Sequence, residues 1–102
     1  MRAVIASGIR FDGVVAFNDS LALGAMRVVQ EAGLRVPDDV SLVSFDNDEL
    51  AAYLRPGLTT IGLPHEDMGR RAVELLLTPD GPPEGQHLVE MPVVIRDSIR
   101  RP

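Results

Sequence analysis

The chain has 102 residues, enough for one small domain with a single core, and its 45% hydrophobic and 25% charged residues are close to the average for globular proteins. This composition excludes collagen-like, disordered and low-complexity chains. Ten Lys and Arg against 15 Asp and Glu give a formal charge of -5, so the chain repels nucleic-acid phosphates and direct DNA binding is not expected. The sequence has no cysteine, which excludes disulfides and thiol chemistry and is typical of a cytoplasmic protein.

The first half of the chain predicts a strand, a helix and a second strand. The apolar run at residues 14–17 indicates a buried parallel strand, and residues 41–45 indicate the next one. Between them, residues 21–32 have the pattern of an amphipathic helix, with Asp19 or Ser20 as its cap and Gly33 at its end. The expected core-facing stripe of this helix comprises Leu21, Ala25, Val28, Val29 and Ala32. Together these elements predict a βαβ unit with a right-handed crossover.

The second half predicts shorter elements and one further helix. Residues 50–54 fit one or two helical turns, and residues 58–61 fit a third strand. A helix is expected over 64–77, with an apolar face made by Met68, Ala72, Leu75 and Leu76. A surface loop over 78–85, strand-like residues 87–95 interrupted by Pro92, and a frayed tail over 96–102 complete the chain.

Polar clusters follow the two best strands. They are Asn18-Asp19-Ser20 and Asp46-Asn47-Asp48. Because ligands of open α/β sheets bind at the carboxyl ends of parallel strands, Asn18 and Asp46 could offer an amide and a carboxylate to a small polar ligand. The alternative is that these residues only cap a helix and form a turn, where Asn and Asp are common in any protein. The residues by themselves leave both interpretations open.

Catalytic and metal-binding signatures are weaker. His65-Glu66-Asp67 are consecutive and share no helical face, so they fit a solvated first turn of a helix. The chain has no EF-hand spacing, nucleophile elbow, Walker loop or dinucleotide fingerprint. A small α/β enzyme that uses Asp46 as nucleophile or base remains a third possibility, although no positioned partner is evident. We therefore expect a protein that is not an enzyme and needs no metal or cofactor.

Several strings in a fixed order carry a family resemblance over residues 11–98. They are Phe17-Asn18-Asp19-Ser20-Leu21-Ala22-Leu23-Gly24-Ala25-Met26, Ala32-Gly33-Leu34-Arg35-Val36-Pro37-Asp38-Asp39-Val40-Ser41, Phe45-Asp46-Asn47, Leu58-Thr59-Thr60-Ile61 and Gly69-Arg70-Arg71-Ala72. This sequence strongly resembles the carboxyl-terminal part of the LacI/GalR transcriptional regulators. The resemblance implies an α/β fold of the periplasmic-binding-protein-like (type I), Rossmann-like kind, here incomplete, with a parallel βαβ core.

The resemblance also implies a function and its residues. Regulators of this family act in the cytoplasm as homodimers or tetramers. A small-molecule effector, commonly a sugar or a nucleobase derivative, binds between two lobes and changes the affinity for operator DNA. The positions matching Asn18 and Asp46 line the cleft in that family, and their neighbours Asp19 and Asn47 are further candidates. Leu23 and Met26, which lie off the expected core stripe, and Tyr53 are candidates for the dimer interface.

The sequence departs from the family in its extent. The helix-turn-helix that contacts DNA, the hinge helix and most of the amino-terminal lobe have no counterpart here, so the chain is expected to be a fragment. The expected parts are residues 1–61 from the carboxyl-terminal lobe, 62–86 as a crossover helix and loop of the amino-terminal lobe, and 87–102 as the return strand and tail. The helix after Pro64 is then expected to be poorly anchored. A fragment of a periplasmic sugar- or solute-binding protein is the alternative, disfavoured because residues 1–8 contain no signal peptide or membrane span.

Overall fold

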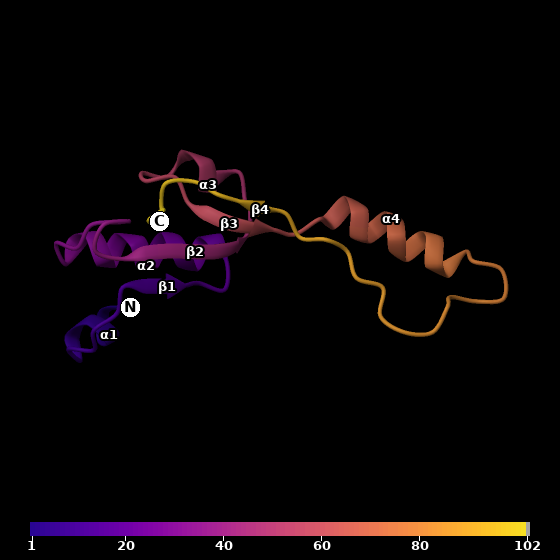
Figure 1. Cartoon of the computed structure of the whole chain (residues 1–102), viewed down its shortest axis with the longest axis horizontal. Helices are drawn as coiled ribbons and strands as arrows, with labels where there is room; N and C mark the ends of the chain where they lie inside the picture. The colour runs from indigo at the N-terminus through magenta and orange to yellow at the C-terminus, as the bar shows by residue number, and fades with distance from the viewer. Residues whose placement is uncertain (102) are drawn as a thin grey trace.

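The structure, a computed structural model, describes residues 1–101. It contains a four-stranded, mostly parallel sheet (Figure 1). Its strands lie in chain order: β1 (Gly13–Val15), β2 (Ser41–Asp46), β3 (Thr59–Gly62) and β4 (Val93–Val94). β1, β2 and β3 are parallel, whereas β4 runs antiparallel to β3. The helices are α1 (Arg2–Ala6), α2 (Asp19–Glu31), α3 (Leu50–Tyr53) and α4 (His65–Leu76). The predicted βαβ unit is therefore present as β1-α2-β2, and the predicted mixed α/β fold is confirmed.

The core lies where α2 and α3 meet one face of the sheet. Its members, all nearly inaccessible to solvent, are Ala16, Ala22, Met26, Leu42, Ala51 and Leu58. Because side chains alternate along a strand, Val43, Phe45 and Ile61 face the other way, and all three stay only partly buried. The expectation that residues 14–17 form a strand buried on both faces is wrong for the same reason, since Val15 is 74% exposed.

The predicted core-facing stripe of α2 is right only in part. Val29 is buried and Ala25 packs partly buried against the core, as expected. Leu21 is 59% exposed and Ala32 is exposed, whereas Ala22 and Met26, which are not in the stripe, are buried. This helix has apolar residues around most of its circumference, so its periodicity alone does not select a face. The contact with β2 makes that selection, and it places Met26, at 3% exposure, inside the core instead of at the helix surface.

The carboxyl-terminal tail is docked into the sheet, and not frayed as expected. Ser98 is fully buried, its backbone oxygen accepts the N–H of Leu42 at 2.8 Å, and its hydroxyl donates to the oxygen of Leu42 at 2.6 Å. The same hydroxyl accepts the N–H of Thr59 at 2.8 Å. The tail is held in this place because Ser98 pairs with backbone groups of Leu42 in β2 and Thr59 in β3. Pro102, the last residue of the predicted tail, lies outside the described residues.

The helix α4 and the segment that follows it project from the rest of the molecule along its longest dimension (Figure 1). The molecule measures 59 × 27 × 25 Å along its principal axes. No residue of α4 is buried, and Met68 and Leu76 are 47% and 79% exposed. The expectation of a poorly anchored helix after Pro64 agrees with this arrangement. Within residues 1–101, no helix has both the length and the apolarity needed to span a membrane.

Candidate functional site

The two polar clusters expected from the sequence meet at one edge of the sheet. β1 and β2 are parallel neighbours, paired from Gly13 with Ser41 to Val15 with Val43, so their carboxyl ends point the same way. Asn18 follows β1, and Asp46 is the last residue of β2. The sheet order therefore brings both segments to the edge at which parallel α/β sheets bind ligands.

A cavity of about 400 Å³ opens at this edge. It is lined by Phe17, Phe45, Asp46 and Leu63, so its walls are mostly apolar and Asp46 is the one ionisable residue at its border. Phe17 is 82% exposed, which is unusual for a large aromatic side chain and leaves its ring free to contact a ligand. Sequence reasoning missed Phe17, Phe45 and Leu63 as site residues. Their position directly before or after the ends of parallel strands was the signal that could have found them.

Asn18 has a structural role in addition to its place at the edge. Its side-chain oxygen accepts the N–H of Leu21 at 2.8 Å, so Asn18 is the cap of α2, whereas Asp19 and Ser20, the expected caps, are already helical. A capping oxygen satisfies one of the free N–H groups of the first helical turn. Asn18 itself does not line the cavity beside Asp46.

The backbone turns sharply where β2 ends. Asp46 and Asn47 have φ angles of 106° and 52°, in the left-handed region that non-glycine residues rarely adopt. The N–H of Asn47 donates to the hydroxyl of Thr60 at 3.2 Å, and its side-chain oxygen accepts from the guanidinium of Arg96 at 2.9 Å. The side chain of Asn47 is therefore tied to the segment that follows β4.

Asp19 is buried beneath this turn, with 4% of its surface exposed. One carboxylate oxygen accepts hydrogen bonds from the hydroxyls of Ser44 and Thr60, the latter at 2.8 Å. The other oxygen accepts the N–H of Asp48 at 2.7 Å. Three donors from β2, β3 and the turn thus surround a carboxylate that the sequence suggested as a ligand contact.

The three candidates for a dimer interface differ in accessibility. Tyr53, at the end of α3, is 68% exposed, and Leu23 on α2 is 37% exposed. Met26 lies in the core, as described above, and its side chain has almost no surface left for a partner. The sequence misplaced Met26 because it assigned the core-facing stripe of α2 to the wrong residues.

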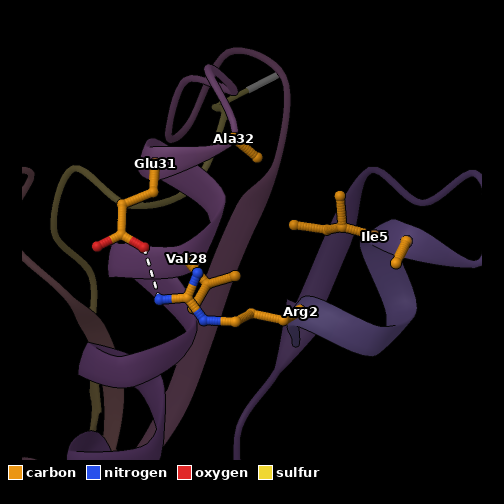
Figure 2. Close-up of a pocket in the computed structure, with 6 residues that line it drawn as sticks. Arg2, Ile5, Val28, Glu31 and Ala32 are labelled. Carbon is orange, nitrogen blue, oxygen red and sulfur yellow. Dashed lines mark hydrogen bonds and ion pairs between the residues drawn. The ribbon is translucent and has the colours of Figure 1, made fainter.

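A second cavity, of about 270 Å³, lies between α1 and α2 (Figure 2). Ile5, Val28 and Ala32 supply apolar walls, and Arg2 bridges to Glu31 at 2.8 Å. The hydrogen bonds from Arg27 and Arg2 lower the pKa of Glu31 from its ordinary value of 4.5. Because the charged groups here already bind each other, this cavity offers a ligand little polar recognition.

Comparison with known proteins identifies the class of this fold. The family described as periplasmic binding protein-like domain matches residues 2–99, so the chain belongs to that family. In the structure, the mostly parallel sheet agrees with this membership, and the cavity beside Asp46 lies at the carboxyl ends of its strands.

Several similar proteins are LacI-type transcription regulators. The HTH-type transcriptional repressor PurR of Vibrio campbellii is 41% identical over 91 residues, which are 86% of this chain and 27% of that protein. The lac repressor dimer bound to operator and the anti-inducer ONPF has a TM-score of 0.87 at 33% identity, covering 96% of this chain and 35% of that one. A LacI family regulator from Arthrobacter sp. FB24, solved in complex with lactose, has a TM-score of 0.82 at 32% identity, covering 97% of this chain and 38% of that one. This chain thus spans about a quarter of the length of the curated relatives it matches.

Proposed function

We propose that this chain is the effector-binding portion of a LacI-type transcription regulator, which acts without catalysis in the cytoplasm. A small molecule rich in hydroxyl groups, most simply a sugar, binds at the sheet edge and changes operator binding by a DNA-binding domain elsewhere in the protein. The observation that carries the proposal is the cavity that Asp46 lines together with Phe17, Phe45 and Leu63 at the carboxyl ends of the parallel strands. A carboxylate accepts hydrogen bonds from ligand hydroxyls, and aromatic faces pack against the apolar face of a sugar or nucleobase ring.

The assignment of site residues follows from this arrangement. Asp46 accepts hydrogen bonds from the ligand, and the amide NH2 group of Asn18 donates one from the neighbouring strand end. Asn47 belongs to the same turn, although its side-chain oxygen already accepts from Arg96. The lactose complex of the Arthrobacter relative supports a sugar as the class of effector.

The division into lobes is part of the same proposal. Residues 1–61 belong to one lobe, residues 62–86 cross to the other lobe, and residues 87–102 return. Two observations support it. The helix α4 projects away from the sheet (Figure 1). Its apolar face meets only Leu63 and residues 87–91 of the described chain, and Met68 and Leu76 stay 47% and 79% exposed. In a longer protein the second lobe would cover Met68 and Leu76 and would close over the edge at Asp46.

We also propose that the regulator is a dimer, with exposed Tyr53 and Leu23 at the contact between subunits. The dimeric lac repressor in the comparison supports this assembly. Operator DNA is contacted only through a helix-turn-helix domain outside these residues, because this chain is acidic, with a charge of -5.

The test begins with the coding sequence on both sides of this segment. An in-frame helix-turn-helix upstream is the expected result, whereas an upstream signal peptide would favour a periplasmic solute-binding protein and overturn the regulator assignment. The protein from the longest reading frame is then screened by thermal denaturation with lactose, glucose, ribose, adenine and guanine. We expect at least one of these compounds to raise the melting temperature, because a ligand that binds only the folded state stabilises it.

A further inference from the structure

The buried carboxylate of Asp19 contacts the turn at the ligand edge, and not the cavity. Asp19 is absent from the lining of the cavity beside Asp46, and only 4% of its surface is exposed. Its two oxygens accept from three donors that all lie within the protein: Ser44, Thr60 and the N–H of Asp48. A carboxylate enclosed in this way is not free to bind an effector.

The hydrogen bonds of Asp19 reach both peptide groups that follow Asp46. The N–H of Asp48 donates directly to one oxygen at 2.7 Å. The N–H of Asn47 donates to the hydroxyl of Thr60 at 3.2 Å, and that hydroxyl donates in turn to the other oxygen of Asp19 at 2.8 Å. A hydroxyl can accept and donate at the same time, so this second link is continuous.

These two peptide groups belong to a backbone segment that needs support. Asp46 and Asn47 have φ angles of 106° and 52°. Such angles cost non-glycine residues on the order of 1–3 kcal/mol each and persist only where the surrounding structure holds them. Two bonds that end on one buried charge provide such a hold, because hydrogen bonds to ionised acceptors are stronger than those between neutral groups.

We infer that Asp19 is a positioning residue, which fixes the turn over residues 46–48 and thereby holds Asp46 at the edge of the cavity. This inference depends on the function proposed above. If an effector binds at this edge, the contacts of Asp19 preorganise the edge before the effector arrives. The inference replaces the direct ligand contact that the sequence suggested for Asp19. Preorganised polar groups bind more tightly because less ordering is needed on binding.

Thr60 and Ser44 provide a matched pair of variants for the test. Both side chains are fully buried, and both hydroxyls donate to the same oxygen of Asp19. Only Thr60 also accepts from the turn, through the N–H of Asn47. Thr60→Val therefore removes a link to the turn, whereas Ser44→Ala removes a bond to Asp19 and leaves that link in place. Asp19→Asn removes the charge on which both links end.

The measurement is residue-resolved NMR of the purified chain without any ligand. It records amide hydrogen exchange of Asn47 and Asp48, together with the three-bond coupling constants that report the φ angles of Asp46 and Asn47. We expect Asp19→Asn and Thr60→Val to speed exchange at these amides at least about tenfold and to shift the coupling constants. Ser44→Ala leaves both close to the wild-type values. The amide of Ala16, which donates to Val43 at 2.8 Å between β1 and β2, reports whether the sheet stays intact.

Two outcomes would overturn the inference. If Thr60→Val and Ser44→Ala behave alike at Asn47 and Asp48, the turn is not held through Thr60. If exchange at Ala16 accelerates as much as at the turn in every variant, the network stabilises the whole fold without positioning Asp46. Should Asp19→Asn fail to fold, the Thr60 and Ser44 variants still decide. Failure of the longer protein to bind any screened compound would remove the proposed function and leave these exchange rates unchanged.

Discussion

Ser98 and Leu42, which lie 56 positions apart in the chain, form two hydrogen bonds with each other. The hydroxyl of Ser98 donates to the carbonyl oxygen of Leu42 at 2.6 Å, and the N–H of Leu42 donates to the carbonyl oxygen of Ser98 at 2.8 Å. Both residues are almost completely buried, with exposures of 0% and 1%. The tail thus completes the hydrogen bonding of β2, the central parallel strand.

Ser98→Ala should weaken this region, because it leaves the N–H of Thr59 and the oxygen of Leu42 without their side-chain partner. An unsatisfied buried polar group costs about 1–3 kcal/mol. Amide exchange at Thr59, measured by NMR on the chain, should accelerate at least about tenfold. Ser7→Ala is the control, since the exposed Ser7 hydroxyl donates only within the first helix, to the oxygen of Val4. Unchanged exchange at Thr59 would contradict the role of Ser98.

The helix α4 should be the least protected helix of eight or more residues in the isolated chain. None of its residues is buried, whereas α2 buries four: Asp19, Ala22, Met26 and Val29. Since local stability follows buried contact, amides in residues 65–76 should exchange at least about tenfold faster than those in residues 21–31. Equal protection of α2 and α4 in a monomeric sample would contradict this prediction, because it would mean that α4 packs against the rest of the chain.

Two glycines should respond to alanine in opposite directions. Nothing lies within 4 Å of an added Cβ at Gly24, in the middle of α2, so Gly24→Ala should stabilise the chain by about 1 kcal/mol through helix propensity. At Gly62, a Cβ would stand 3.1 Å from a side-chain carbon of Pro92, and Gly62→Ala should cost about 1–3 kcal/mol through overpacking. The two variants are compared by thermal denaturation in sucrose solution, followed by circular dichroism. Equal shifts in melting temperature would contradict the predicted crowding between residue 62 and Pro92.

Acid should weaken the loop that leads into β2. The side-chain hydrogen bonds from Arg35, followed by the bond from its backbone N–H at 2.8 Å, lower the pKa of Asp39 from its ordinary value of 3.8. A lowered folded-state pKa means that the stabilisation is fully present above pH 3.8 and is lost as the pH falls below it through the folded-state value. Urea titrations at a series of acidic pH values should show that the free energy of unfolding falls as the pH falls. Asp39→Asn should make this fall smaller. Because the pair is exposed, added salt should also make it smaller.

Asp46→Ala in the longest reading frame should weaken effector binding at least about tenfold, because each hydrogen bond to a charged group is worth roughly 1.5–3 kcal/mol. Operator binding in the absence of effector should remain close to the wild-type level. Calorimetric titration uses the compound identified by thermal screening. Asp48→Ala is the matched control, since the contact of Asp48 with Asp19 is made by its backbone N–H and survives the substitution. Equal affinities of the wild type and the Asp46 variant would remove Asp46 from the site.

The sequence by itself determined the order of the elements from β1 to α4 and the edge at which the candidate site lies, but it did not predict the helix α1. Apolar runs at residues 14–17 and 41–45, the helical pattern between them, and the polar residues that follow each strand are all local properties of the chain. They predicted the β1-α2-β2 unit, which the structure contains. They also placed Asn18 and Asp46 at the carboxyl ends of neighbouring strands, which share one edge of a parallel sheet.

Only the tertiary structure decided which faces and which side chains are buried. α2 is apolar on most sides, so its packing against β2, and not its periodicity, placed Met26 in the core and left Leu21 exposed. Ser98 docks on Leu42 through bonds that no local pattern encodes, since the partners are far apart in sequence. Asp19 is the clearest case: its donors come from β2, β3 and the turn between β2 and α3, and only the folded sheet brings them to one carboxylate.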